Sequence, residues 1–503
     1  MTDATATDAL LGFSPLEEFV DSFSIQFARR HRVMGMRSAG GEPVVALLDQ
    51  PTSIEAFDVV IRRLGHAARP VFVSLEAVET AIQDGYSGRD SEAQSVLDSM
   101  STDRLIAEAT NSAGGEDLLD SEGRAPIIRL VNHLLLDAVK AGASDVHVQP
   151  YEDRVVVRQR IDGVLFDSFE IPKAVQEEVL TRLKVLGRMN IAEKRLPQDG
   201  RATVSLGNRV VDLRIASLPT SHNERIVVRL LDKSARLYSL DELGMPPRDL
   251  SAFASLVRRD HGMVLVTGPT GSGKSTTLYG VLQQIDSHDS NVLTLEDPIE
   301  YALDGISQTQ INEKKGMTFA SGMRSVLRQD PDIIMVGEIR DAETAVMAIQ
   351  ASLTGHLVLS TLHTNDAASA VTRLLDLGIE PYLVSSSLVG VLAQRLVRRL
   401  CERCKVADVQ ARLPGEFSDG ATVCRAVGCD ECRGTGYRGR VGLFELLLVD
   451  DAICELIAAR ASSGKIRESA IAAGTKLLST DGLEKIARGI TTMEEVLRVT
   501  TVE

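Results

Sequence analysis

A glycine-rich run with the pattern G-x-x-x-x-G-K-S carries the strongest chemical signal in this chain of 503 residues. It runs from Gly268 to Ser275, after an apolar stretch that ends at Thr267 and before a segment with helical periodicity. Backbone N–H groups of such a loop surround nucleotide phosphates at the N-terminus of the following helix. Lys274 can reach the β- and γ-phosphate oxygens, and the Ser275 hydroxyl is placed to bind Mg²⁺. The expected ATP-binding residues are Gly268, Pro269, Thr270, Gly271, Ser272, Gly273, Lys274, Ser275 and Thr276.

Two further apolar runs end in carboxylates. The first ends in Glu338, at the position of a group that orients or deprotonates the water attacking the γ-phosphate. Gly337 stands where an aspartate on the Mg²⁺ side usually precedes that glutamate, so Mg²⁺ is expected to rely on Ser275, water and another acid. The second run ends in Glu296 and Asp297, and either could be that acid, because the carboxyl ends of parallel strands face the ligand crevice. The alternatives are a structural role for Glu338 and a solvated helix cap for the second pair.

Two histidines bracket the apolar run Leu357–Leu362. His363, at its carboxyl end, is placed to contact or sense the γ-phosphate, whereas His356 is at the other end. Spacing alone equally allows a packed or surface histidine. We therefore take Lys274, Glu296, Glu338 and His363 as the catalytic candidates of this region.

Four of the six cysteines form two C-x-x-C pairs, Cys401 with Cys404 and Cys429 with Cys432. Two such pairs supply four thiolates for a tetrahedral, structural Zn²⁺ site. The alternative is a redox-active or vestigial set of cysteines. Cys424 and Cys454 lack pair spacing and receive no role.

The composition favours a globular intracellular protein. Apolar residues make up 44% and charged residues 25% of the chain. A formal net charge of −15, aromatics at only 4% and the lack of Trp disfavour nucleic acid as the main substrate. The acidic start lacks a signal peptide, and the apolar runs are too short to span a bilayer, so a partner must provide any membrane contact. Cytoplasm is the expected location.

The chain divides into six regions by composition and periodicity. Residues 1–84 indicate a small α/β module, with helices at Ser14–Val33, Ser53–Leu64 and Leu75–Ile82 and strands at Pro43–Leu48 and Arg69–Ser74. An acidic linker rich in Ser and Gly follows at 85–125. Residues 126–234 begin with an apolar helix and continue with alternating strands. Apolar strands alternate with helices over 235–400, which indicates a parallel sheet covered by helices. The cysteine-bearing insertion takes 401–440, and 441–503 is mostly helical.

Four motifs in order resemble the secretion-superfamily ATPases, which include type II secretion ATPases and the assembly and retraction ATPases of type IV pili. They are the glycine-rich loop, Leu295–Tyr301, Val336–Asp341 and Ser360–Ala367. The Gly337-Glu338 ending is similar to an atypical pattern of that family. Residues 126–234 resemble it through Ser144–His147, Arg160–Gly163, Pro197–Arg201 and Glu224–Leu231, so the resemblance covers about 126–503.

The resemblance implies a multidomain α/β protein. It implies a RecA-like P-loop ATPase core with a parallel sheet, a preceding α/β (PAS-like) domain, a small N-terminal α/β docking domain and a four-cysteine zinc insertion. Arginines of the second domain are implied to approach the nucleotide phosphates at an interface, where they stabilise transition-state charge. By motif position these are Arg201, Arg214, Arg225 and Arg229, and the alternative for each is a salt-bridged sheet arginine. Asn223 departs from the family's usual Gly, but Asn tolerates positive φ.

The implied activity is that of a homohexameric motor in which ATP hydrolysis drives pseudopilus assembly and export through a type II secretion system at the inner membrane. The implied partners are cytoplasmic parts of the L and F family components of the secretion platform, and 1–84 would dock there. Pilus extension is the alternative, and the cysteine element disfavours retraction because retraction ATPases generally lack it. A DNA translocase of the same fold would need a basic, aromatic groove. A scaffold without turnover would need loss of Lys274 or Glu338, and both are present.

Overall fold

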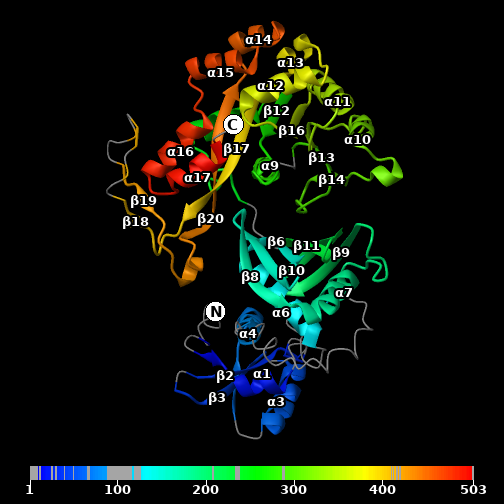
Figure 1. Ribbon diagram of the computed structural model, residues 1–503, viewed down its shortest axis with the longest axis vertical. Helices are drawn as coiled ribbons and strands as arrows, with labels where there is room; N and C mark the ends of the chain where they lie inside the picture. The colour runs from blue at the N-terminus through cyan, green and yellow to red at the C-terminus, as the bar shows by residue number, and fades with distance from the viewer. Residues whose placement is uncertain are drawn as a thin grey trace. The chain divides into compact units, whose positions relative to one another are not determined.

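The chain forms two units in the computed structural model, residues Met1–Ala235 and Arg236–Glu503 (Figure 1). Each unit has its own sheets and cores, and each is described by itself. The structure describes residues 10, 13–23, 27–28, 31–38, 40–48, 50–64, 68–87, 116–117, 126–206, 209–232, 238–285, 289–408, 411, 413–414, 417 and 421–500. Most of the expected linker 85–125 therefore lies outside the described residues.

The first unit begins with a four-stranded sheet in the order β1-β2-β3-β4. Its strands are β1 (Ser14–Pro15), β2 (Val33–Arg37), β3 (Pro43–Leu47) and β4 (Arg69–Phe72), and its helices are α1 (Glu17–Ser22), α3 (Pro51–Leu64) and α4 (Leu75–Ser87). The expected helix Ser14–Val33 is wrong at both ends: its first two residues are strand, α1 ends where Phe23 turns extended, and Val33 starts β2. The β2 strand escaped prediction because Gly35 interrupts its apolar pattern. A Cβ there would lie 2.4 Å from the Phe19 Cβ, so the glycine admits the buried Phe19 ring.

A seven-stranded sheet follows, in the order β5-β9-β10-β11-β6-β7-β8. In that order the strands are β5 (Glu116–Asp117), β9 (Gln198–Leu206), β10 (Arg209–Thr220), β11 (Asn223–Asp232), β6 (Ala143–Pro150), β7 (Arg154–Ile161) and β8 (Val164–Pro172). The helices are α6 (Pro126–Lys140), the 3-10 helix η3 (Lys173–Val175) and α7 (Gln176–Leu186). The apolar residues of α6 join the valines of β6, β7 and β11 in one core. Asn223 closes the β10–β11 turn with φ of 106°, so Asn does serve at the position of the family glycine.

The second unit is built on another seven-stranded sheet, in the order β14-β13-β15-β16-β12-β17-β20. In that order the strands are β14 (Ser307–Gln310), β13 (Val292–Glu296), β15 (Ile333–Val336), β16 (Leu357–Leu362), β12 (Gly262–Thr267), β17 (Leu388–Leu400) and β20 (Tyr437–Leu448). All neighbouring strands run parallel except β17 and β20. The predicted parallel sheet is therefore confirmed, with one antiparallel strand at its edge.

Helices cover this sheet, as predicted, and they lie on both of its faces. Alternate residues of β12 face opposite cores: Met263 and Leu265 belong to one cluster, and Val264 and Val266 belong to the other. The helices are α8 (Pro247–Leu256), α9 (Lys274–Leu282), α10 (Phe319–Val326), α11 (Ala342–Leu353), α12 (Ala367–Asp376), α13 (Pro381–Ser387), α14 (Asp451–Ala458), α15 (Ser463–Ala472), α16 (Leu478–Ala487) and α17 (Met493–Thr500). Short elements are the 3-10 helices η4 (Glu313–Lys315) and η6 (Asp430–Cys432) and the strand pair β18 (Val406–Ala407) and β19 (Cys424–Arg425). Among the described residues, each helix is too short or too polar to cross a membrane.

The carboxyl-terminal part of the chain belongs to the same sheet. Strand β20 pairs with β17 along its length, from Gly390 opposite Leu448 to Leu400 opposite Tyr437. The first eight residues of 441–503, expected to be mostly helical, are therefore strand. The cysteine-bearing segment is the connection between these two strands, and helices follow it from Asp451 onwards.

Candidate functional site

The glycine-rich loop joins the end of a central strand to the start of a helix. Strand β12 ends at Thr267, and α9 begins at Lys274. Gly273 precedes α9 with φ of 88°, in the left-handed region that favours glycine. Gly268 has φ of 152°, and a Cβ there would lie 2.4 Å from the Gln394 carbonyl oxygen. Larger residues at these two positions would be strained, so this strand-loop-helix arrangement, which is typical of phosphate-binding sites, depends on both glycines.

Lys274 is held against its own loop in this structure. Its Nζ donates hydrogen bonds to the carbonyl oxygens of Gly268, at 2.9 Å, and Pro269, at 3.0 Å. The residue is 8% exposed, and this burial lowers the pKa of the ammonium to about 8. The neighbouring Ser275 is exposed. A phosphate group that enters the loop therefore has to draw Lys274 away from two carbonyl oxygens.

Glu338 and His363 meet at the carboxyl ends of neighbouring parallel strands, β15 and β16. The His363 Nε2 lies 3.2 Å from Glu338 Oε2, and the Arg340 guanidinium donates to Glu338 Oε1. Burial opposes ionisation of Glu338, but Arg340 and His363 outweigh it and hold the pKa of this carboxyl below its usual value. The Glu338 charge in turn acts to raise the pKa of Lys274, so the two residues share one electrostatic site. Glu338 is thus ionised and partly exposed beside the glycine-rich loop.

The end of β16 is tied to the end of β12 through two threonines. The Thr267 hydroxyl lies 2.7 Å from the Thr364 hydroxyl and donates to the Leu362 carbonyl oxygen at 3.1 Å. This link fixes His363, between Leu362 and Thr364, relative to the loop. His356 lies at the opposite end of β16, where its Nδ1 is 2.8 Å from the Ala351 carbonyl oxygen. His356 is therefore a packed histidine, which is the alternative that its spacing in the sequence allowed.

Glu296 is buried and takes part in a hydrogen-bond network within the fold. Its carboxylate accepts hydrogen bonds from Tyr279 of α9, from Thr294 at 2.6 Å and from Gln308 at 2.9 Å. The residue is 4% exposed. The adjacent Asp297 is exposed, and its charge acts on Arg340, the partner of Glu338. Of the two acids considered for Mg²⁺, Asp297 is therefore the one with an exposed carboxylate on the Glu338 side.

The packing against β13 accounts for the glycine at position 337. A Cβ on Gly337 would lie 3.2 Å from the Leu295 carbonyl oxygen and 3.5 Å from the Glu296 Cα. Gly337 also donates its N–H to Leu295 O at 2.8 Å, so the two backbones approach closely. An aspartate at this position would press on β13, and the sheet consequently presents Glu338 without the usual preceding acid.

Three of the four candidate arginines form a row across the second sheet. Arg201 of β9 pairs with Arg214 of β10, and Arg214 pairs with Arg229 of β11. Directly paired residues share one face of an antiparallel sheet, so their side chains project on the same side. The row continues on β6 with Asp145, whose Oδ1 accepts from Arg229 Nε at 3.0 Å. Arg229 therefore forms a salt bridge within the sheet, which was the alternative to contact with a nucleotide phosphate.

The fourth arginine, Arg225, lies on the same face because it is four residues from Arg229 along one strand. Its Nη2 is 3.1 Å from the His147 Nδ1. Burial, and next the charge of Arg225, lower the pKa of His147, so the imidazole stays neutral beside the guanidinium. The four arginines are therefore gathered on one face of one sheet. Sequence reasoning missed Asp145 as their counter-charge, although it lies in the resembling motif Ser144–His147.

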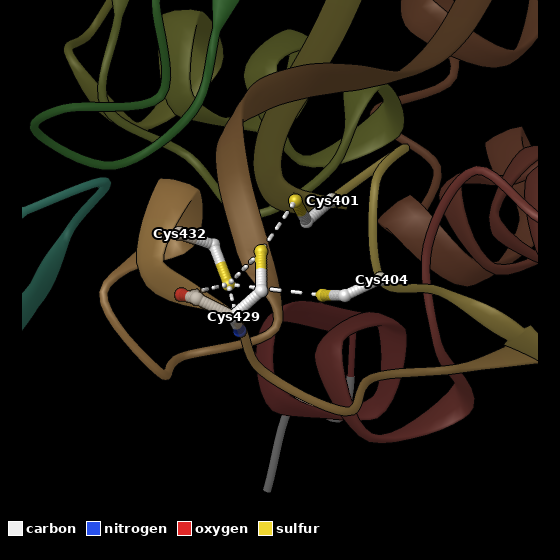
Figure 2. Close-up of side chains that lie close together, drawn as sticks. All are labelled: Cys401, Cys404, Cys429 and Cys432. Atoms are coloured by element: carbon white, nitrogen blue, oxygen red, sulfur yellow. Dashed lines mark hydrogen bonds between the residues drawn. The ribbon is translucent and has the colours of Figure 1, made fainter.

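The four paired cysteines converge in the connection between β17 and β20. Figure 2 shows their side chains pointing toward one another. All four sulfurs lie within 4.8 Å of each other, with 3.9 Å between Cys401 and Cys429 and 3.8 Å between Cys404 and Cys432. Sulfurs around a tetrahedral zinc are roughly 3.8 Å apart when the Zn–S bonds are about 2.3 Å. The cluster is thus arranged to hold a metal ion, and Cys424 and Cys454 are not part of it.

The sulfur of Cys432 is stabilised as a thiolate, which is the form that binds a metal. Burial opposes ionisation of Cys432, but backbone N–H groups of Cys429, at 3.1 Å, and Gly436, at 3.2 Å, donate to its sulfur. These hydrogen bonds stabilise the thiolate and lower the pKa of Cys432 to about 6. N–H···S bonds of this kind tune metal-bound thiolates and fix their orientation.

The chain matches known families over both of its units. The family described as Type II/IV secretion system protein matches residues 120–498, and the MshEN domain matches residues 9–92. The Type II secretion system ATPase E of Vibrio cholerae is 49% identical over 457 residues, which are 90% of this chain and 91% of that protein. The Type II secretion system protein HxcR of Pseudomonas aeruginosa is 50% identical over 435 residues, covering 85% and 90% of the two chains.

A solved structure of similar fold describes the pilus retraction motor PilT with bound ADP. It is 26% identical, covers 73% of this chain and 96% of its own, and superposes with a TM-score of 0.50. The likeness extends over most of the shorter protein, which agrees with the P-loop fold described above.

Proposed function

The chain belongs to the Type II/IV secretion system protein family and is an ATPase, and from this premise we propose that it is the hexameric motor of a type II secretion system. In this role ATP hydrolysis powers pseudopilus assembly and protein export at the inner membrane. The chain works in the cytoplasm and associates with the membrane peripherally, through its partners. The observation that carries the proposal is the identity of 49% and 50% to two proteins of type II secretion, over 85% or more of this chain.

Hydrolysis is assigned to the groups at the carboxyl ends of β12, β15 and β16. Gly268–Thr276 bind the phosphates through backbone N–H groups, and Lys274 pairs with the β- and γ-phosphate oxygens. Glu338 orients the attacking water and accepts its proton, because it is ionised, partly exposed and held by Arg340 and His363. His363 contacts the γ-phosphate from the same side.

Mg²⁺ neutralises charge on the phosphates when it is bound. Ser275 is its protein ligand in this proposal, and Asp297 is a better second acid than Glu296. The Glu296 carboxylate already accepts hydrogen bonds from three donors, so it acts by fixing α9 relative to β13. This assignment keeps Glu296 as a residue of the site in a positioning role.

The arginine face of the second sheet is the proposed source of charge stabilisation from a subunit interface. Arg201, Arg214, Arg225 and Arg229 lie on one face, and Asp145 takes the next place in the row of Arg201, Arg214 and Arg229. An arginine that reaches a transferring phosphoryl group at an interface stabilises its transition state strongly. A ring of subunits brings such a face to each nucleotide, which is why we propose a homohexamer.

We propose that the four-cysteine cluster holds a structural Zn²⁺, since four thiolates with no open position are typical of such sites. Residues beside the cluster attach it to the carboxyl-terminal helices. Leu400 donates its N–H to the Ile490 carbonyl oxygen at 2.8 Å, and Lys405 Nζ donates to that of Gly489 at 3.2 Å. The metal therefore stabilises the packing of β17 and β20 against the α16–α17 turn.

The module of residues 1–84 is proposed to dock on cytoplasmic parts of the L and F family components of the secretion platform. The MshEN domain match over 9–92 sets this part apart from the ATPase family match, which starts at 120. A module with its own family match suits partner binding, because that match does not include the glycine-rich loop.

Gene deletion in the source organism tests the type of machine. The proposal predicts that exoprotein export is lost, that piliation persists, and that the wild-type gene restores export. Loss of piliation with intact export would favour the pilus extension alternative. ATP hydrolysis that rises severalfold on addition of DNA would favour a translocase instead.

A further inference from the structure

Gln394 of β17 lies next to the glycine-rich loop, near Gly268 and Gly273. Its carbonyl oxygen faces the Cα of Gly268, since a Cβ there would approach it to 2.4 Å. Its side-chain Nε2 faces Gly273, where a Cβ would lie 2.7 Å away. The residue is fully buried. One residue of a neighbouring strand therefore approaches both glycines that shape the loop, with its backbone at Gly268 and its side chain at Gly273.

The amide of Gln394 is anchored at one atom and unpartnered at the other. Its Oε1 accepts a hydrogen bond from the Thr277 hydroxyl at 2.6 Å, which fixes the amide against α9. Its Nε2 finds no acceptor within the described part of the chain. The Ser272 hydroxyl of the loop, 3% exposed, likewise has no partner among the described residues. Buried polar groups are nearly always paired, so two unpaired ones at one loop call for an explanation.

The two unpaired groups, Gln394 Nε2 and the Ser272 hydroxyl, are found where Lys274 donates hydrogen bonds to carbonyl oxygens of its own loop. Lys274 Nζ donates to the Gly268 and Pro269 carbonyl oxygens in this state. A bound nucleotide draws the lysine to its phosphates, and the loop must then rearrange its hydrogen bonds. The unpaired Gln394 Nε2 lies next to Gly273, within this loop.

We propose that Gln394 is a positioning residue for nucleotide binding: its Nε2 gains an acceptor in the loop only when the loop is closed around the phosphates. The unpaired amide disfavours the ligand-free arrangement, and its satisfaction favours the bound one. Gln394 thereby raises nucleotide affinity without touching the nucleotide.

The test compares Gln394→Met with Thr277→Val in the full-length protein, by titration with Mg-ADP. Both variants lose the bond between Gln394 and Thr277, but only Gln394→Met loses the Nε2 donor. We expect the ADP dissociation constant to rise about fivefold in Gln394→Met, the equivalent of one hydrogen bond, and less than about twofold in Thr277→Val. Equal effects of the two variants would mean that the amide only braces α9, and would overturn the proposal.

Steady-state kinetics of ATP hydrolysis further separate a role of Gln394 in nucleotide binding from a role in bracing α9. An interaction made alike in the ground and transition states changes KM and leaves kcat nearly constant. We expect Gln394→Met to raise the KM for ATP by the same factor as the ADP dissociation constant. A fall in kcat at unchanged KM would contradict this. Should Gln394→Met fail to fold, Gln394→Leu removes the same donor with a shorter apolar side chain; unchanged ADP affinity in that variant would also reject the proposal.

Discussion

The burial of Lys274 makes nucleotide affinity depend on pH in a range where ordinary lysines do not titrate. In the ligand-free loop the pKa of Lys274 is lowered to about 8, mainly by burial. Only the protonated ammonium attracts the phosphates. The affinity is therefore expected to be full below this pKa and to fall as pH rises through it.

The magnitude follows from the pKa. At pH 7 about nine-tenths of Lys274 carries its proton, and at pH 9 only about one-tenth does. The Mg-ADP dissociation constant should accordingly rise about tenfold between these two pH values. Near pH 8, binding should take up about half a proton per site, because the phosphates restore the charged lysine.

Isothermal titration of Mg-ADP at several pH values, in buffers with different heats of ionisation, measures both quantities. Lys274→Arg is the matched control, since guanidinium stays charged throughout this range. The variant should bind with a dissociation constant that varies little between pH 7 and 9. A wild-type change of less than about twofold, or an equal change in Lys274→Arg, would refute the assignment to Lys274.

Three further predictions concern stability. Cys432→Ser should lose the bound metal and lower the melting temperature, and retention of one metal per chain on elemental analysis would contradict the four-thiolate site. Lys184→Met should lower the free energy of unfolding by about 3–5 kcal/mol, because it leaves the buried Glu224 carboxylate without its cationic partner; adding Glu224→Leu should recover most of this loss in thermal unfolding. Burial opposes ionisation of Glu495, but a hydrogen bond from Arg398 helps hold the pKa of this carboxyl at about 2. The ionised Glu495 therefore stabilises the fold at pH values above 4.5, and this stabilisation is lost as pH falls toward 2. Wild-type stability should therefore fall more steeply below pH 4.5 than that of Glu495→Gln, by at most about 3 kcal/mol.

The local parts of the nucleotide site could be predicted from the sequence. A loop that binds phosphates through backbone atoms needs its glycines and its lysine at fixed spacing in one short run, and Gly268–Ser275 have that spacing. The parallel strands of the second unit are short apolar runs between helices, and these also were visible. The four-cysteine cluster could be predicted from the C-x-x-C spacing of the two cysteine pairs alone. In each case the signal lies within a few neighbouring residues.

Contacts between distant segments could not be predicted in this way. Gln394 is 117 residues from its partner Thr277, and nothing in its apolar strand marks it as a neighbour of the loop. The arginine row depends on the register of three strands, which an alternating pattern does not specify. Glu296 looked like a free acid at a strand end, but hydrogen bonds from Tyr279 and Gln308 use its carboxylate. These features are set by tertiary packing.

The hydrolysis rate of purified Glu338→Gln tests the central claim most directly. Glutamine keeps the size and shape of Glu338 and can still accept a hydrogen bond from Arg340, but it lacks the negative charge and cannot accept the proton of the attacking water. The proposed role of Glu338 predicts a fall in kcat of at least about a hundredfold, with the Mg-ADP dissociation constant within about twofold of wild type. Hydrolysis at the wild-type rate would contradict the assignment of Glu338 as the catalytic carboxylate of this ATPase.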